Sequence, residues 1–181
     1  GTPVYLTPGT YQNKKMGELP NLNKINCHSS FKVGTFTVTP VAVPHDAKEP
    51  CQFLVASNDL TVGVLTDLGH PTPHVKARYN DCDALLLECN HDEEMLNKGP
   101  YSNSLKLRVG GDYGHLNNSQ AAEILEAINL ERLRHLIISH ISQKNNLPSL
   151  AQQALQPLLS KWSGSLALAS QEKGFDWVYL N

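Results

Sequence analysis

Two hydrophobic patterns follow each other along the chain, and the first is typical of β-hairpins. Between residues 31 and 43, apolar and β-branched residues alternate with polar ones, which predicts two strands that turn at Gly34. Residues 52–56 and 60–66 are also strand-like, and the turn sequence at 57–59 predicts that they pair as a hairpin.

The second pattern alternates short apolar runs with helical spacing. Residues 84–88 and 136–138 predict buried strands, and helices are predicted at 92–97, at 119–128 with Ser119 as the N-cap, and at 149–159. Toward the ends we expect strands at 3–6 and 177–180, a helix start at Pro8 and a polar surface stretch at 12–26. Together the two patterns predict one α/β layered domain over residues 1–181 with a mixed sheet.

Composition narrows the possible functions. The 181 residues are 40% apolar and 18% charged, which is enough for one hydrophobic core, and no apolar run is long enough to predict a membrane span. The net charge of −2 argues against a surface covered with basic side chains. A nucleic acid would therefore have to bind locally, through metal ions and a few side chains. The four cysteines form no CxxC motif and predict free, mostly buried thiols and a cytoplasmic location.

Three polar residues stand just past the ends of apolar runs. His45 follows 41–43, Asp67 follows 64–66 and His140 follows 136–139. Side chains at strand ends of layered α/β folds converge on one edge of the sheet, where ligands bind. Two imidazoles and a carboxylate suit a divalent metal ion. A single histidine in such a position is more often a loop hydrogen-bonder, and three of them shift that balance only modestly.

Five short motifs around these residues are more specific than their spacing. In chain order they read PHD at 44–46, TDLG at 66–69, LECNHD at 87–92, GHLNN at 114–118 and SHISQKNN at 139–146. Together they resemble the WalJ-type (also YycJ- or VicX-type) proteins of the metallo-β-lactamase superfamily, which are similar to DNA exonucleases. The resemblance runs from Val4 to the end of the chain.

The resemblance implies an αββα layered sandwich and a metal-dependent phosphodiester hydrolase, with DNA as the expected substrate. It implies two divalent ions, zinc or manganese, with a hydroxide bridging them. His45 and His140 correspond to metal ligands, and Asp67 corresponds to the carboxylate that bridges the two ions. Alternatives are a small or cyclic phosphodiester as substrate, or a non-catalytic domain that serves binding or assembly.

The resemblance also implies roles for residues beside the metal ions. Glu88 and His115 correspond to an acid–histidine pair in which the histidine protonates the leaving oxygen. The competing interpretations are a charge that caps the sheet edge for Glu88 and a loop hydrogen bond for His115. Ser142, Asn145 and Asn146 are expected to lie close to the substrate phosphate.

One departure from the family pattern is large. The HxHxDH motif, which supplies most ligands of both ions in the family, does not occur in these 181 residues. The chain is therefore expected to be the C-terminal portion of the fold, with weak metal affinity and little activity alone. It is also expected to expose sheet surface that binds the N-terminal segment or a second copy.

Overall fold

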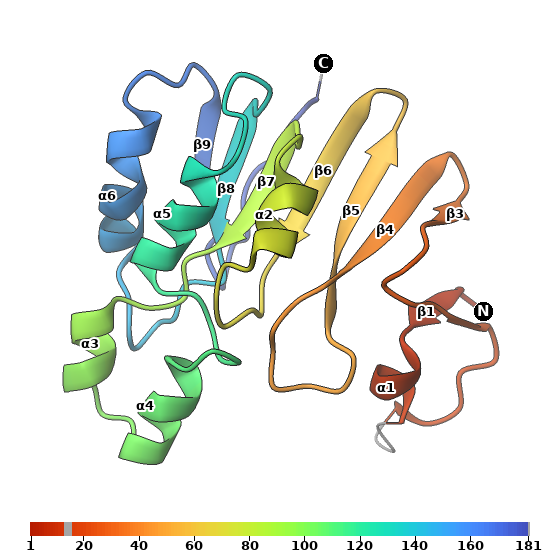
Figure 1. Ribbon diagram of the computed structural model, residues 1–181, viewed down its shortest axis with the longest axis horizontal. Helices are drawn as coiled ribbons and strands as arrows, with labels where there is room; N and C mark the ends of the chain where they lie inside the picture. The colour runs from red at the N-terminus through yellow and green to blue at the C-terminus, as the bar shows by residue number, and fades with distance from the viewer. Residues whose placement is uncertain (13–15, 181) are drawn as a thin grey trace.

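A mixed sheet of seven strands forms the body of the protein in the computed structural model, which describes residues 1–12 and 16–180 (Figure 1). The strands lie side by side in chain order: β3 (Phe31–Val33), β4 (Phe36–Ala42), β5 (Cys51–Ser57), β6 (Leu60–Leu65), β7 (Ala84–Glu88), β8 (His135–Ser139) and β9 (Ser165–Leu168). Strands β3 to β6 pair antiparallel, and β6 to β9 pair parallel. The predicted change from hairpins to strand–helix alternation is confirmed.

Three helices cover one face of the sheet: α2 (Pro73–Tyr79), α5 (Asn118–Glu126) and α6 (Pro148–Leu159) (Figure 1). Alternate strand residues such as Leu65, Leu85, Leu87 and Leu136 are fully buried beneath them. Burying one such side chain stabilises the fold by roughly 1.5–3 kcal/mol. Two short helices, α3 (Glu93–Lys98) and α4 (Asn103–Val109), lie beyond the edge at which β7 ends (Figure 1).

The N-terminal residues form a separate small unit. Strand β1 (Val4–Leu6) pairs parallel with β2 (Leu22–Lys24), and α1 (Pro8–Tyr11) follows β1 with Thr7 as its N-cap. The predicted strand and the helix start at Pro8 are therefore present. The polar stretch at 12–26 contains β2, which was not expected, and its residues 13–15 lie outside the described ranges.

The opposite face of the large sheet is also apolar. The register places Phe53, Val64 and Leu86 side by side on this face, and all three are only partly buried. Residues 175–180 lie across part of it and, with Leu86 and others, enclose a cavity of about 440 Å³. A sheet with two apolar faces normally has both faces covered by other layers.

We expect this face to drive association of the 181-residue chain in solution. The chain should bind a hydrophobic dye such as ANS and sediment as a concentration-dependent oligomer. Val64→Lys should reduce both signals without changing the far-ultraviolet circular dichroism, because the face is open enough to admit a charged side chain. A strictly monomeric chain that binds no dye would contradict this expectation.

Several local predictions were wrong. Residues 177–180 form no strand, because they lie across the face of the sheet and pair with none of the described strands, and Trp177 is 90% exposed. Helix α5 is capped by Asn117, in a capping box with Gln120, instead of by Ser119.

Within the described residues, no helix is long and apolar enough to span a bilayer.

Candidate functional site

The candidate site lies at the edge where the parallel strands β6, β7 and β8 end. Glu88 is the last residue of β7, Asp67 follows β6 and His140 follows β8. His45 lies in the loop between β4 and β5, and His115 lies just before α5. The parallel pairing carries three of these side chains to one edge, as their strand-end positions predict.

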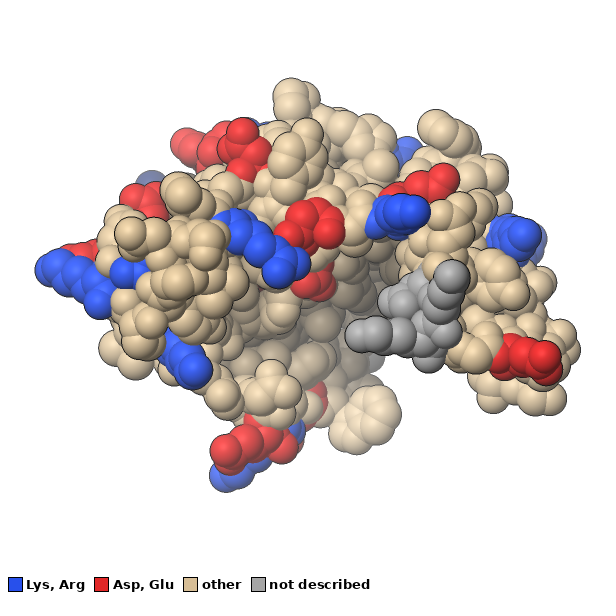
Figure 2. Space-filling model, turned by 90° about the horizontal axis from the view of Figure 1, so that it is seen from below, with Lys and Arg blue, Asp and Glu red and all other residues tan. Residues whose placement is uncertain are grey.

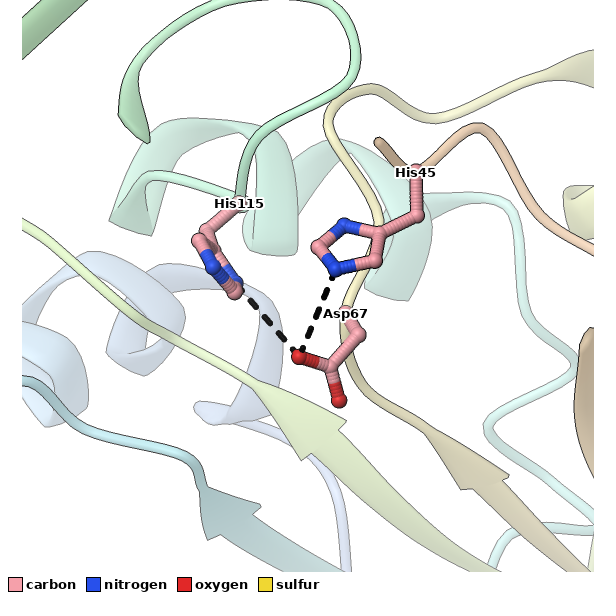
Figure 3. Close-up of side chains that lie close together, drawn as sticks. All are labelled: His45, Asp67 and His115. Carbon is pink, nitrogen blue, oxygen red and sulfur yellow. Dashed lines mark ion pairs between the residues drawn. The ribbon is translucent and has the colours of Figure 1, made fainter. Parts of the chain in front are cut away.

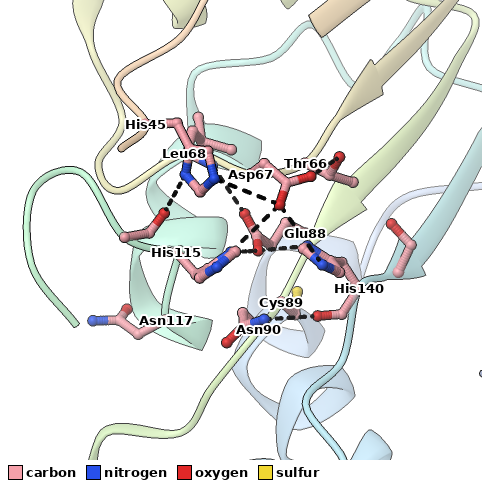
Figure 4. Close-up of polar contacts among 12 residues, drawn as sticks. His45, Thr66, Asp67, Leu68, Glu88, Cys89, Asn90, His115, Asn117 and His140 are labelled. Carbon is pink, nitrogen blue, oxygen red and sulfur yellow. Dashed lines mark hydrogen bonds and ion pairs between the residues drawn. The ribbon is translucent and has the colours of Figure 1, made fainter. Parts of the chain in front are cut away.

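Asp67 is the centre around which the imidazoles gather (Figures 3 and 4). Its Oδ1 lies 3.9 Å from His45 Nε2 and 3.8 Å from His140 Nε2. His115 lies between these two rings, with ring centroids 5.2 Å from each, and its Nδ1 is 3.9 Å from the same Asp67 oxygen. The structure thus places Asp67 within 4 Å of both His45 and His140, and the ligand atoms in mutual reach form two groups that share His115: His45–Asp67–His115 and Glu88–His115–His140.

The imidazole nitrogens are arranged as in a metal site. His45 Nδ1 is 3.0 Å from the carbonyl oxygen of Gly114, and His140 Nδ1 is 2.8 Å from Glu88 Oε1. Donation of one ring N–H to an oxygen orients the ring and leaves the other nitrogen for a cation. The separations from Asp67 fall within twice the usual metal–ligand distance of about 2.0–2.1 Å, so the donor set fits a divalent ion.

Glu88 is fully buried and holds two histidines at once. Its Oε1 lies 2.8 Å from Nδ1 of both His115 and His140, and its Oε2 accepts a hydrogen bond from the backbone N–H of Leu68. Burial alone would raise the pKa of Glu88, but the hydrogen bonds and positive charges of the two histidines outweigh it and lower the pKa. The ionised carboxylate can only accept, so both imidazoles donate from Nδ1.

The hydrogen bond between Glu88 and His115 was expected from the sequence, whereas the one to His140 was not. The Glu88 hydrogen bond raises the pKa of His140 against the opposing effect of its burial. The register pairs Glu88 with Ser139, which sets His140 beside the carboxylate. Only the strand register, which the sequence does not state, could have revealed this second contact.

Two of the candidate ligands have strained backbones. Asp67 has φ = 54° and His140 has φ = 55°, in the left-handed region that residues other than glycine rarely adopt. Such conformations cluster at functional sites, where the surrounding structure enforces them.

The glycines of the TDLG and GHLNN motifs allow the loops around the site to pack closely. A Cβ on Gly69 would lie 2.2 Å from the carbonyl of Asp112, and a Cβ on Gly114 would lie 2.2 Å from the carbonyl oxygens of Arg108 and Val109. Close approach of backbones thus explains these two motif positions.

The expected substrate residues differ in environment. Ser142 borders a polar cavity beside His115 and His140, and so does Asn145. Asn146 is 2% exposed, and its amide donates to the carbonyl of Cys89 and pairs with the side chain of Asn118. In this structure Asn146 therefore supports the loop from within and is not free to contact a phosphate, which corrects the expectation for that residue.

Asp46 is a further polar neighbour, for which the sequence indicated no role. Its Oδ1 lies 3.6 Å from His45 Nε2, and its Oδ2 accepts a hydrogen bond from Arg108 Nε. This hydrogen bond with the Arg108 guanidinium is the main cause of the lowered pKa of Asp46. Figure 2 shows this side of the molecule hollowed, with the acidic and basic side chains of the described residues in separate groups.

Comparisons with known proteins agree with this fold and site. The family model of the beta-lactamase superfamily domain matches residues 1–141. Exodeoxyribonuclease YycJ of Bacillus anthracis is 30% identical over 178 residues, which cover 96% of this chain and 63% of that protein. The chain thus spans less than two thirds of the length of this relative.

Solved structures show the same fold. The metallo-beta-lactamase fold protein YhfI from Bacillus subtilis aligns with a TM-score of 0.68 and 20% identity, over 97% of this chain and 64% of that chain. Zn²⁺-bound PqqB from Methylobacterium extorquens aligns with a TM-score of 0.65 and 17% identity, over 91% and 61% of the two chains. The chain therefore belongs to the metallo-β-lactamase superfamily, and within it resembles the YycJ-type proteins.

Proposed function

We propose that this chain carries half of the active site of a metal-dependent phosphodiester hydrolase that acts on DNA as an exonuclease. The observation that carries the proposal is that His45 and His140 both lie within 4 Å of one oxygen of Asp67. Beside them, the buried Glu88 holds His115. The name of the YycJ relative supports DNA as the substrate class. The free thiols are consistent with a reducing cytoplasm.

The residues divide into ligands and proton-transfer groups. His45 would bind one ion and His140 the other, with Asp67 between them, and zinc and manganese both suit this donor set. Such a pair of ions lowers the pKa of a bound water and stabilises the charge that develops on the phosphoryl group. Each ion would need further ligands, because His45, Asp67 and His140 alone would give each of them two.

His115 would act as the general acid. Its Nδ1 is occupied by Glu88, so Nε2 is the atom available to donate a proton to the departing oxygen. Glu88 orients the ring and stabilises its positive charge. Ser142 and Asn145 lie along the cavity on the same side and would contact the substrate there.

Metal binding tests the ligand assignment. In the full-length protein, Asp67→Ala should lower the affinity for zinc and manganese by at least about 100-fold, more than the 10–100-fold typical of a residue that only orients a ligand. Cleavage of single-stranded and double-stranded DNA should be lost with the metal. Affinity and cleavage are measured by metal titration and with end-labelled oligonucleotides.

A matched carboxylate serves as the control. Asp112→Ala removes an exposed carboxylate of the same type from a nearby loop and should leave metal affinity within about twofold of wild type. Equal metal affinity in Asp67→Ala and wild type would show that Asp67 is not a ligand.

A further inference from the structure

A cavity opens beside the metal centre, with His115 and His140 in its wall. Its volume is about 340 Å³, and Tyr101, Lys144 and Asn145 are among the residues that line it. This volume falls in the range of small-molecule sites. The cavity is therefore large enough to hold part of a substrate.

The position of His115 decides which part of the substrate this cavity faces. A general acid must lie within hydrogen-bonding reach of the leaving oxygen. A different cavity, of about 260 Å³, is lined by His45 and Asp67 but not by His115. The cavity that has His115 in its wall therefore faces the leaving-group side of a phosphodiester.

Tyr101 and Lys144 give this cavity the chemistry of a nucleotide site. Tyr101 lies between α3 and α4, Lys144 lies between β8 and α6, and Lys144 Nζ is 5.8 Å from the centre of the Tyr101 ring. Lys76 and Lys98 form salt bridges, whereas Lys144 forms none with a carboxylate in residues 1–12 and 16–180. An aromatic ring can stack with a base, and an unpaired ammonium can neutralise a phosphate.

Asn145 supplies an independent observation. It is 1% exposed, and neither Oδ1 nor Nδ2 of its side chain has a hydrogen-bond partner. Ser142 Oγ accepts hydrogen bonds from the backbone N–H groups of Lys144 and Asn145, which fixes the turn that carries both residues. Buried amides are nearly always hydrogen-bonded, so the unsatisfied Asn145 side chain is an unusual feature of the loop that presents Lys144.

We propose that the Tyr101–Lys144–Asn145 cavity is the subsite for the leaving-group nucleotide. Tyr101 stacks with the base, and Lys144 binds the next phosphate along the strand. The proposal rests on the proposed phosphodiesterase function, because His115 defines the leaving-group side only if it is the acid. It names the part of a DNA chain that this side of the site recognises.

A nucleotide titration tests the subsite directly. Thymidine 3′,5′-bisphosphate is the probe, since it carries a base and a phosphate on each side of the sugar. In calorimetric titrations of the metal-loaded full-length protein, Tyr101→Ala and Lys144→Gln should raise Kd at least about tenfold, the loss expected for one stacked base or one phosphate contact. Tyr101→Phe keeps the ring and should stay within about twofold of wild type.

Two controls make the result specific. Lys161→Gln removes the same charge from an exposed position after α6, at the opposite edge of the sheet, and should leave Kd unchanged. Inorganic phosphate should bind Tyr101→Ala as tightly as wild type, because it has no base to stack with the ring. Equal Kd values for the bisphosphate in wild type, Tyr101→Ala and Lys144→Gln would overturn the proposal.

Kinetics separate failure of the subsite from failure of the proposed function. The ratio of kcat/KM for an oligodeoxynucleotide to kcat/KM for bis(4-nitrophenyl) phosphate should fall at least about tenfold in Tyr101→Ala and Lys144→Gln. An unchanged ratio in an active enzyme would refute the subsite only. A wild-type protein that cleaves neither ester would refute the proposed function, and the bisphosphate titration would still decide whether nucleotides bind here.

Discussion

His115→Ala is expected to lower kcat for DNA cleavage by about 10²–10⁴-fold, the usual contribution of a positioned general acid. Bound metal should stay at the wild-type level, because His45, Asp67 and His140 are untouched. Bound metal distinguishes this role from that of a metal ligand. The ligand atoms of His115, Asp67 and His45 all lie within 4.8 Å of one another, so His115 is also close enough to bind a metal ion.

The measurement combines metal analysis with single-turnover kinetics. A histidine on the exposed surface of α2, His74, provides the matched control, and His74→Ala should retain wild-type kcat. A substrate with an activated leaving group such as 4-nitrophenolate should be much less affected by His115→Ala, because it needs no proton to depart. Loss of metal in His115→Ala would mean that His115 is a ligand instead of the acid.

The placement of the candidate site could be predicted because it depends on local signals. A polar residue just after an apolar run marks the end of a buried strand, which made His45, Asp67 and His140 candidates, and the resemblance to a known family then implied their roles as ligands. Asn58, with φ = 53°, and Gly34, with φ = 60°, lie at the two predicted hairpin turns. These features are encoded within a few residues of one another.

The features that escaped prediction depend on partners distant in the sequence. The apolar run at 177–180 has the composition of a strand, but strand formation needs a paired neighbour, and this segment lies across the face of the sheet instead of beside an edge strand. Strand β9 (Ser165–Leu168) was missed for the converse reason: its four residues carry a weak pattern, and pairing with β8 stabilises it. Asn146 was misjudged because its partners, Cys89 and Asn118, come from other motifs.

We expect Glu88 to be required both for metal binding and for proton transfer by His115. Glu88→Gln keeps one oxygen that can accept from His115 and His140, but it removes the negative charge and puts an N–H donor where Oε2 accepts from Leu68. We expect metal affinity to fall about 10–100-fold, as for other residues that orient a ligand. We also expect kcat to fall, because His115 loses the carboxylate that stabilises its charge. His115→Ala, by contrast, should reduce kcat alone.

The same substitution should change how stability depends on pH in the metal-free protein. The pKa of Glu88 is lowered from 4.5, so its stabilisation is present above about pH 4.5 and is lost as pH falls through the lowered pKa. The pKa of His140 is raised from 6.5, so its stabilisation is complete below about pH 6.5 and is lost as pH rises through the raised pKa. The ion pair therefore contributes most between about pH 4.5 and 6.5.

Urea unfolding at several pH values measures this contribution. Glu88→Gln should lower the free energy of unfolding by about 1.5–3 kcal/mol at pH 5.5, the usual value for hydrogen bonds to a charged group. The difference from wild type should shrink as pH rises through the raised pKa of His140, because the imidazole then loses its charge in the folded chain as well. Glu88→Ala should be less stable still, by about 3–5 kcal/mol relative to wild type, because it leaves two imidazoles without an acceptor. A wild-type–Gln difference that is the same at pH 5.5 and 8.5 would show that Glu88 is not ion-paired in the metal-free protein, and would remove the electrostatic basis for its control of His115 and His140.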